Sequence, residues 1–114
     1  MPDATIDITT FKELQEAAGA DFVVELVDTF LEEAPQMVKE LRAALAEGDA
    51  DKFRRAAHSL KSNSHTFGAL KLGAMARELE LNALDSARPA PEVLDELSHE
   101  YARVAAALKR LRDA

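Results

Sequence analysis

The amino-acid sequence predicts an all-α protein, an up-and-down four-helix bundle with a short additional helix at its N-terminus. Apolar residues recur every three or four positions along most of the 114 residues, which is the period of an amphipathic helix. Strand signals are nearly absent, because aromatic residues make up only 5% and no alternating run is bounded by turn residues. The length and the 47% hydrophobic content suit one domain, residues 1–114, with one core.

The apolar repeats and the turn residues between them place the helices along the chain. We expect helices over residues 10–18, 21–46, 50–67 and 70–84, and a last helix that begins near residue 91. The last helix has the strictest pattern, with apolar residues alternately three and four positions apart: Leu94, Leu97, Tyr101, Val104, Leu108 and Leu111. Such a seam is typical of a helix that packs nearly parallel or antiparallel to its neighbours in a bundle.

Capping and helix-breaking residues mark the ends of these helices. Thr9 or Thr10 is expected to cap the first helix and Asp49 the third, since hydroxyl and carboxylate side chains bond to free amides at helix starts. Gly68 is expected to end the third helix. Pro35 falls inside the second helix and should kink it, because it lacks an amide hydrogen and clashes with the preceding turn.

The composition argues against several classes of protein. A net charge of −7 disfavours broad nucleic-acid binding, and the longest apolar run, residues 104–108, is far too short to span a membrane. The N-terminal stretch lacks the basic and apolar segments of a signal peptide, and there is no cysteine for a disulfide or a thiolate metal site. We therefore expect a cytoplasmic protein without a nucleic-acid or membrane partner.

One segment is basic although the chain as a whole is acidic. From Lys52 to Arg77 the sequence has six Lys and Arg residues and no Asp or Glu, a charge of +6. The rest of the chain then has 8 basic and 21 acidic residues, a charge of −13. We refer to residues 52–77 as the basic island. Such a segment favours an acidic protein partner or a phosphate group.

Two of the three histidines, His58 and His65, lie in the basic island on the predicted third helix. With Phe53 on the buried stripe, a rotation of about 100° per residue turns both histidines towards solvent. Lys61 and Ser62 follow His58 by three and four residues, so they lie beside it on the same face. The pattern leaves two interpretations open, a surface histidine without a task and a reactive imidazole held out to solvent.

The histidines are poorly spaced for a metal site. His58 and His65 are two turns apart, about 10 Å along the helix axis, which is too far to share one ion. Glu96 and His99 have the E-x-x-H spacing of di-iron bundles, but the second copy of the motif that such sites need is missing. We therefore predict no bound metal, and a metalloprotein bundle remains a distant alternative that metal analysis would expose.

The string AHSLKSNSHTFGA resembles the signature of the histidine-containing phosphotransfer (HPt) family, whose members relay phosphoryl groups between receiver domains. The positions that fit this signature are Ala57, His58, Leu60, Lys61, Ser64, Phe67, Gly68 and Ala69. The flanking sequences also look like those of the family, since FLEEAPQMVKELRAAL precedes the string and a Leu79–Glu80 pair follows it. The sequence departs from the family at Ser62, where glycine is usual, and at Asn63 and His65, where small residues are common.

The resemblance implies a role for each residue of the site. His58 would accept the phosphoryl group through Nε2, and a neutral imidazole is a competent nucleophile near neutral pH. Lys61 would offset the charge of the phosphoryl oxygens, and Gln36 would hydrogen-bond near the imidazole. Pro35 and Gly68 would serve the structure of the helices that carry the site.

The resemblance also implies the partners, which are the receiver domains of response regulators and a hybrid histidine kinase, bound by a monomer. The predicted contact residues are Arg54, Arg55, Ser62, His65 and Lys71. Ser62 would serve by being small, and His65 is either a contact or merely solvated. No nucleotide-binding motif is visible, so we expect a phosphoryl carrier rather than a kinase. The receiver domain would supply the Mg²⁺ that in-line phosphoryl transfer normally requires.

A rival function of another class remains open at this point. A helical adaptor could bind an acidic protein through the basic island without any phosphorylation. The two hypotheses differ in whether partner binding survives the loss of His58.

Overall fold

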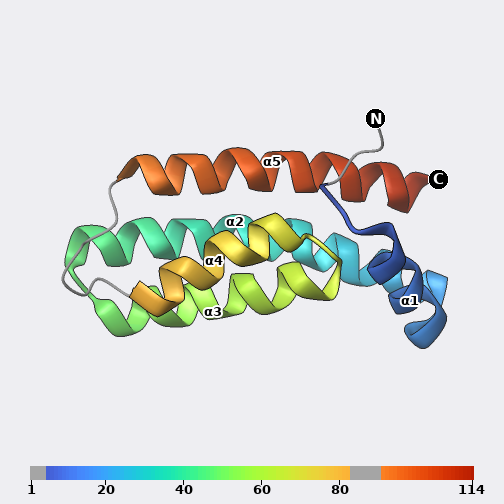
Figure 1. The fold of residues 1–114 in the computed structure, drawn as a ribbon, viewed down its shortest axis with the longest axis horizontal. Helices are drawn as coiled ribbons and strands as arrows, with labels where there is room; N and C mark the ends of the chain where they lie inside the picture. Colours follow the sequence, from blue (N-terminus) through green and yellow to red (C-terminus); the bar gives the residue numbers. More distant parts are fainter. Residues whose placement is uncertain (1–4, 83–90) are drawn as a thin grey trace.

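The computed structural model describes residues 5–82 and 91–114, and within them it contains five α-helices and no strand (Figure 1). The helices are α1 (Ile8–Ala18), α2 (Ala20–Glu47), α3 (Ala50–Thr66), α4 (Leu70–Asn82) and α5 (Pro91–Asp113). The predicted all-α fold, with one short helix ahead of four longer ones, is therefore confirmed. None of these five helices is long and apolar enough to cross a membrane. The predicted end of the fourth helix at residue 84 lies outside the described residues.

Helices α2 to α5 run up and down in alternation along the long axis of the molecule (Figure 1). The molecule extends over 42 × 28 × 19 Å along its three principal axes. Helix α3 packs between α2 and α4, and α5 closes the bundle against α2 and α4. Helix α1 lies at one end, against α2 and α3, and stays outside the four-helix arrangement. The predicted up-and-down topology is thus the observed one.

The apolar stripes of the helices meet in one core. The buried residues of α5 include most of its predicted seam, with two more partly buried beside them: Leu94, Leu97, Val104 and Leu108, then Tyr101 and Leu111. Phe53, Ala57 and Leu60 of α3 are fully buried as well. The phase predicted for α3, which decides where His58 points, is therefore confirmed.

The N-terminus of α1 differs from the prediction. The helix begins at Ile8, and its N-cap is Asp7, whose carboxylate accepts a hydrogen bond from the Thr10 amide at 3.2 Å. The expectation that Thr9 or Thr10 caps this helix was wrong, because Asp and Thr both cap helices and the chain offers them within four positions. Asp49 caps α3 as predicted, through a hydrogen bond of 3.0 Å to an amide of the first turn.

A glycine turn joins α3 to α4 and contacts the chain ahead of α1. Gly68 has a φ of 82°, a left-handed conformation that residues with a side chain rarely adopt. The Asp7 amide donates to the Gly68 carbonyl at 2.8 Å. A Cβ on residue 68 would lie 2.8 Å from the Asp7 carbonyl oxygen. Both the backbone and the close approach therefore require glycine, which gives the structural role predicted for Gly68 a physical basis.

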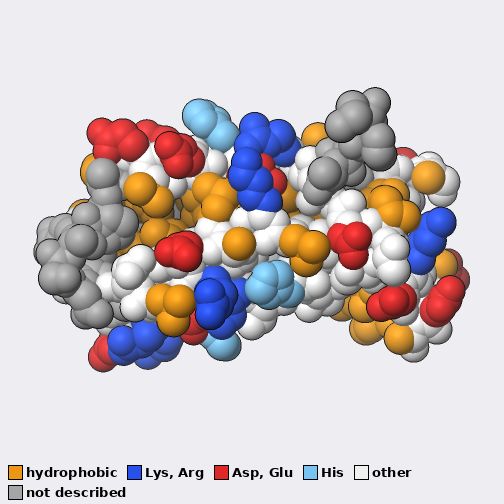
Figure 2. Space-filling model, in the orientation of Figure 1, with side chains coloured by type: hydrophobic (Ala, Val, Ile, Leu, Met, Phe, Trp, Pro, Cys, Tyr) orange, Lys and Arg blue, Asp and Glu red, His pale blue; other side chains and the backbone are white. Residues whose placement is uncertain are grey.

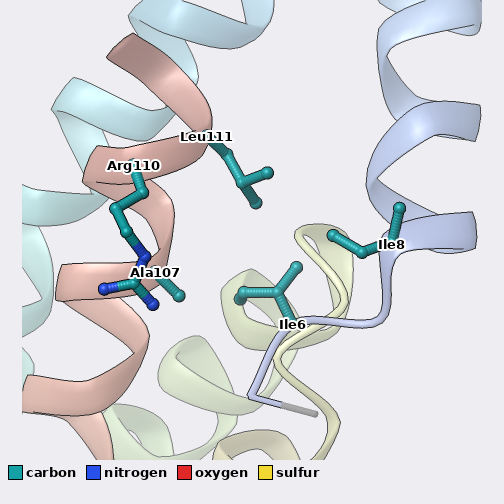
Figure 3. Close-up of a pocket in the computed structure, with 5 residues that line it drawn as sticks. All are labelled: Ile6, Ile8, Ala107, Arg110 and Leu111. Atoms are coloured by element: carbon teal, nitrogen blue, oxygen red, sulfur yellow. The ribbon is translucent and has the colours of Figure 1, made fainter. Parts of the chain in front are cut away.

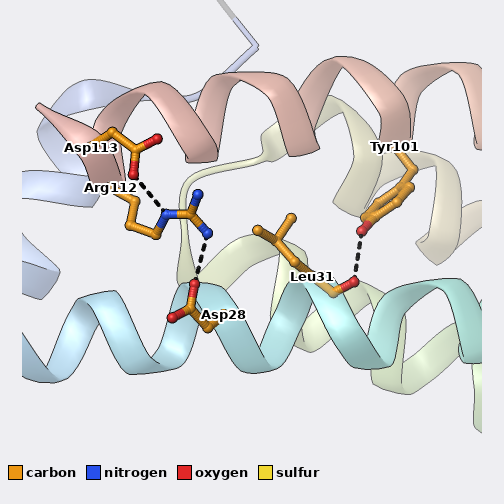
Figure 4. Close-up of polar contacts among 5 residues, drawn as sticks. All are labelled: Asp28, Leu31, Tyr101, Arg112 and Asp113. Carbon is orange, nitrogen blue, oxygen red and sulfur yellow. Dashed lines mark hydrogen bonds and ion pairs between the residues drawn. The ribbon is translucent and has the colours of Figure 1, made fainter.

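Pro35 does not interrupt α2, which continues through it as one helix. Proline has no amide hydrogen, so the carbonyl four residues earlier, that of Leu31, loses its partner within the helix. The Tyr101 hydroxyl of α5 donates a hydrogen bond to this carbonyl at 3.4 Å (Figure 4). Farther along the same pair of helices, the Arg112 guanidinium lies 2.8 Å from the Asp28 carboxylate (Figure 4). The carbonyl that Pro35 frees thus becomes one of several polar links between α2 and α5, which also include the ion pair of Arg42 with Asp95 at 2.9 Å.

The segment ahead of α1 packs beside the end of α5. Ile6 is buried, and Ile8 faces Leu111 across a small notch that Ala107 and Arg110 also line (Figure 3). These contacts place α1 against the end of the bundle where α3 meets α4.

Candidate functional site

His58, Lys61 and Glu80 form a hydrogen-bonded group on the surface where α3 meets α4. His58 and Lys61 lie one turn apart on α3, and Glu80 faces them from α4. The Glu80 carboxylate uses both of its oxygens, since Oε2 lies 2.6 Å from Nδ1 of His58 and Oε1 lies 2.6 Å from Nζ of Lys61. One carboxylate thus fixes the positions of both side chains.

The imidazole of His58 points outward, as the helical phase of α3 predicts. Its side chain is 58% exposed, whereas those of Lys61 and Glu80 are 23% and 18% exposed. The ring is therefore accessible to another protein, while the groups that hold it are partly screened from solvent.

The hydrogen bond to Glu80 determines which nitrogen of His58 carries the proton. An ionised carboxylate only accepts hydrogen bonds, so the neutral imidazole presents its N–H at Nδ1. The lone pair is then left on Nε2. This arrangement prepares Nε2 to act as a nucleophile, and the carboxylate can balance the positive charge that the ring acquires when Nε2 forms a bond.

The two basic neighbours keep Glu80 ionised. The hydrogen bond from Lys61 is the largest influence, and with the one from His58 it holds the pKa of Glu80 below its ordinary value of 4.5. Partial burial acts in the opposite direction but does not prevail. The group that orients His58 is therefore a carboxylate at every pH near neutrality.

Glu80 is the member of this group to which the sequence assigned no role. Its contact with His58 depends on how α3 and α4 pack against each other, and no local pattern contains that information. A hint was present, because Glu80 directly follows Leu79, which is buried. An acid at the margin of a buried stripe can reach across to the neighbouring helix.

Ser62 lies one turn beyond His58 and is exposed on the same face of α3. Its carbonyl accepts a hydrogen bond of 3.0 Å from the Thr66 hydroxyl, as is common for Ser and Thr inside helices. Serine has a small side chain, and the clearance that it would give a partner beside the imidazole stays a prediction.

Gln36 is exposed on α2 and lines a surface hollow together with Ser59, the residue that follows His58. The other residues that line the hollow are Glu32, Glu33, Met37 and Glu40. Among the described residues the structure records no hydrogen bond between Gln36 and His58. The role predicted for Gln36 therefore stays a prediction.

Most cations of the basic island are paired with acids that lie outside it in the sequence. Each of the following lies within 4.0 Å of a carboxylate: Lys52 with Glu47, Arg54 with Asp51, Lys61 with Glu80, and Lys71 with Glu100. Arg55 and Arg77 are exposed and have no ion pair with a described residue. The charge of +6 counted along the segment is therefore not its charge in the folded protein, because folding brings four acids to it.

His65 and Lys71, two of the predicted contact residues, have neighbours within the bundle. The ring of His65 lies so close to Gly73 of α4 that a Cβ on residue 73 would collide with it. Lys71 Nζ lies 4.0 Å from the carboxylate of Glu100, a buried residue of α5 that also binds Arg103 at 2.6 Å. Both residues contact other helices of the bundle, and their contacts with a partner stay predictions.

The sequence matches known proteins of one kind. The family model described as the Hpt domain matches residues 25–114. Over 91 residues the chain is 28% identical to the sensor protein TorS of Escherichia coli (strain K12), a match that covers 80% of this chain and 10% of TorS. The chain thus spans about a tenth of the length of that relative.

The fold is shared with solved structures. The crystal structure of histidine-containing phosphotransfer protein B (HptB) from Pseudomonas aeruginosa PAO1 superposes with a TM-score of 0.86 at 33% identity, over 96% of this chain and 95% of that one. The HPT domain of a sensor hybrid histidine kinase from Shewanella has a TM-score of 0.75 at 20% identity, over 95% and 93% of the two chains, and shows the fold alone. Because the family model matches most of its length, this chain belongs to the Hpt domain family.

Proposed function

We propose that this protein carries phosphoryl groups in a two-component phosphorelay and that His58 is its phosphoacceptor. Membership of the Hpt domain family supports histidine phosphotransfer in general. The observation that carries the assignment to His58 is its exposed imidazole, whose Nδ1 lies 2.6 Å from Glu80 so that Nε2 keeps the lone pair.

The proposed reaction is an in-line transfer from an aspartyl phosphate of the donor protein. The Nε2 lone pair of His58 attacks phosphorus, the N–P bond forms, and the P–O bond to the aspartate breaks. The donor carboxylate leaves with the electron pair of that bond. The ring keeps its proton at Nδ1 and gains positive charge, which the Glu80 carboxylate stabilises at 2.6 Å. The reverse sequence passes the group to the next receiver domain.

Lys61 supports both the ring and the transferred group in this proposal. One of its three N–H donors is directed at Glu80 at 2.6 Å, and the other donors can bond to phosphoryl oxygens one turn from His58. Ser62 contributes by leaving room for the donor protein, and Arg55 offers a cation that pairs with no described carboxylate on the same exposed side of α3.

We infer that the partners are receiver domains of response regulators and of a hybrid histidine kinase. Membership of the Hpt domain family and the name of one similar protein, the sensor protein TorS, support this class of partner. The receiver would supply the phosphoaspartate and the Mg²⁺ that offsets the charge of the transferred group. This chain would then be a cytoplasmic carrier without kinase activity of its own.

The test is label transfer from a panel of receiver domains that carry a radioactive aspartyl phosphate. We expect the wild-type chain and two matched controls, His65→Gln and His99→Gln, to take up label that is stable to base and labile to acid, as a phosphoramidate is. His58→Gln should fold, as judged by circular dichroism, and take up none. If His58→Gln accepts label as the wild type does, the assignment is wrong.

The same experiment separates the carrier from the adaptor. An adaptor would bind its partner equally well with His58 and with glutamine at this position, and no label would pass to either. The pairing of four cations of the basic island with carboxylates within 4.0 Å weakens the adaptor hypothesis, because it removes most of the charge on which that hypothesis depends.

A further inference from the structure

Helix α4 carries apolar residues on two opposite faces, and the bundle covers only one of them. Leu72, Ala76 and Leu79 are buried against the other helices. On the opposite face, Leu70 and Leu81 are 52% and 59% exposed. In Figure 2, separate hydrophobic side chains lie over α4 on the face towards the viewer, with charged side chains between them. Leucine residues exposed to this extent at both ends of one helix face suggest that the face has a partner.

The outward residues of α4 follow a heptad pattern. Leu70, Ala74, Arg77 and Leu81 are four, three and four positions apart, so a rotation of about 100° per residue places them within a band of about 60°. This is the spacing of a coiled-coil seam. We refer to these four residues as the outer seam. All four are exposed.

The spacing of the outer seam reads the same in both directions along the helix. If a second copy of α4 lies antiparallel to the first, Leu70 of one copy meets Leu81 of the other, and Ala74 meets Arg77. A two-fold axis between residues 75 and 76 relates the two copies, and such an interface closes on itself. The Arg77 side chain can pack its aliphatic stem in the seam and extend its guanidinium to solvent.

The charges beside the outer seam also select the antiparallel arrangement. Lys71 and Glu78 lie on one flank of the seam, and in antiparallel pairs each flank meets its own counterpart. Lys71 of one copy and Glu78 of the other then lie within about 3 Å of each other along the axis, twice per dimer. Glu78 has no ion pair with a described residue, and the Lys71 side chain is 67% exposed. Parallel helices would place Glu78 opposite Gly73 and lose both pairs.

We propose that the outer seam of α4 binds a second copy of this chain in an antiparallel, two-fold symmetric dimer. One pair of short helices buries less than a standard protein interface, so the dimer dissociates with a Kd of roughly 0.1–1 mM. Where the resemblance led us to expect a monomer, this proposal expects an equilibrium between monomer and dimer. This proposal concerns assembly alone and does not depend on phosphorylation of His58.

The first test is sedimentation equilibrium of the whole chain at low ionic strength. The weight-average mass should rise from 12.4 kDa towards twice that value between about 10 µM and about 1 mM. Leu81→Ser should raise the Kd at least about tenfold, because each dimer loses two buried leucine contacts. Phe22→Ser, which removes an apolar residue of α2 that is 51% exposed, is the matched control and should leave the Kd unchanged. A wild-type mass that stays at 12.4 kDa throughout would overturn the proposal.

The second test exchanges the charges. Lys71→Glu and Glu78→Lys should each weaken self-association about threefold or more, because each turns two attractive pairs into repulsive ones. An equimolar mixture of the two variants should recover association, since the mixed dimer has both pairs with opposite signs. A mixture that associates no better than its components contradicts the antiparallel seam.

A folding control accompanies the charge exchange, because Lys71 also lies 4.0 Å from Glu100. Thermal unfolding of each variant identifies any loss of stability. If Lys71→Glu does not fold, Glu78→Lys alone still decides, since it must weaken association while the melting temperature stays close to that of the wild type. Unweakened association of Glu78→Lys would contradict the proposal.

Discussion

At His58 the chemistry depends on which of two ring nitrogens is free. A histidine without a fixed acceptor populates both neutral tautomers, and Nε2 then carries the proton for part of the time. Glu80 removes this ambiguity by accepting from Nδ1 at 2.6 Å. Its second oxygen, 2.6 Å from Lys61, holds the carboxylate itself in place. A single residue of α4 thus selects the nucleophilic atom on α3.

Glu80→Gln tests this role. Glutamine has only one oxygen and no charge, so it cannot offer His58 and Lys61 a separate charged acceptor each, as the two carboxylate oxygens of Glu80 do. We expect transfer to slow by about tenfold, as is typical when the residue that orients a functional imidazole is removed. Nitrogen NMR should show protonation at Nδ1 in the wild type and a mixture of tautomers in the variant. Glu96→Gln on α5 serves as the control, and a variant with the wild-type tautomer and rate would contradict the assignment.

The lowered pKa of Glu80 predicts a pH dependence of stability. Since the pKa in the folded chain lies below the ordinary 4.5 of the unfolded chain, folding favours the ionised carboxylate. The resulting stabilisation is complete above the unfolded value and is lost as the pH falls through the folded one. The melting temperatures of the wild type and Glu80→Gln should therefore differ at about pH 7 and converge towards about pH 3. If the difference in melting temperature did not change with pH, the ionisation of Glu80 would be excluded as its source.

Ser62→Arg tests the space beside the imidazole. An arginine one turn beyond His58 would occupy the approach of a docking protein, so we expect transfer to slow by about tenfold or more while the melting temperature changes little. Thr66→Arg, which lies one turn farther along the exposed side of α3, is the matched control. Equal rates for the two variants would show that clearance at residue 62 has no special importance.

Between the helices, α3 and α4 approach closely where small residues face larger side chains. Gly73 is buried under the ring of His65, which comes from the last turn of α3. The absence of a side chain at residue 73 therefore lets the two helices pack side by side at this point.

Gly73→Ala brings two opposing effects. Alanine stabilises a helix interior by about 0.5–1 kcal/mol relative to glycine, whereas the new Cβ displaces the His65 ring. We expect the substitution to stabilise the protein more in a His65→Ala background, where no ring obstructs it, than in the wild type. Urea unfolding of the four variants measures this coupling. If Gly73→Ala changed the stability equally in both backgrounds, the His65 ring would not lie against residue 73.

The hydrogen bond between Tyr101 of α5 and the Leu31 carbonyl of α2 depends on the amide hydrogen that Pro35 lacks. Tyr101→Phe removes the donor to the Leu31 carbonyl, 3.4 Å away, and should cost about 1 kcal/mol of folding free energy. In a Pro35→Ala background the helix regains its own amide for that carbonyl, so the same substitution should cost less. Denaturant unfolding measures both values, and an equal cost in the two backgrounds would mean that the hydroxyl acts elsewhere.

For the molecule as a whole, the sequence predicted those features of the structure that depend on a single helix. The phase of α3 follows from Phe53 and Leu60, and it placed His58 outward correctly. The contacts of His58 with Glu80 and of His65 with Gly73 could not be predicted, since they depend on the relative register of two helices. The surface charge of the basic island could not be predicted in full for the same reason, because two of the acids that pair with it, Glu80 and Glu100, come from other helices.

The hydrogen bond of 2.8 Å between the Asp7 amide and the Gly68 carbonyl affects any protein engineered from this chain. Gly68 lies two residues beyond the end of α3, so force applied to the leading segment is transmitted to the base of the helix that carries His58. A bulky fusion partner attached upstream would exert force on this hydrogen bond. A fusion partner attached after α5 would exert no force on the hydrogen bond between Asp7 and Gly68. This position is therefore the better choice for an immobilised sensor built on this scaffold.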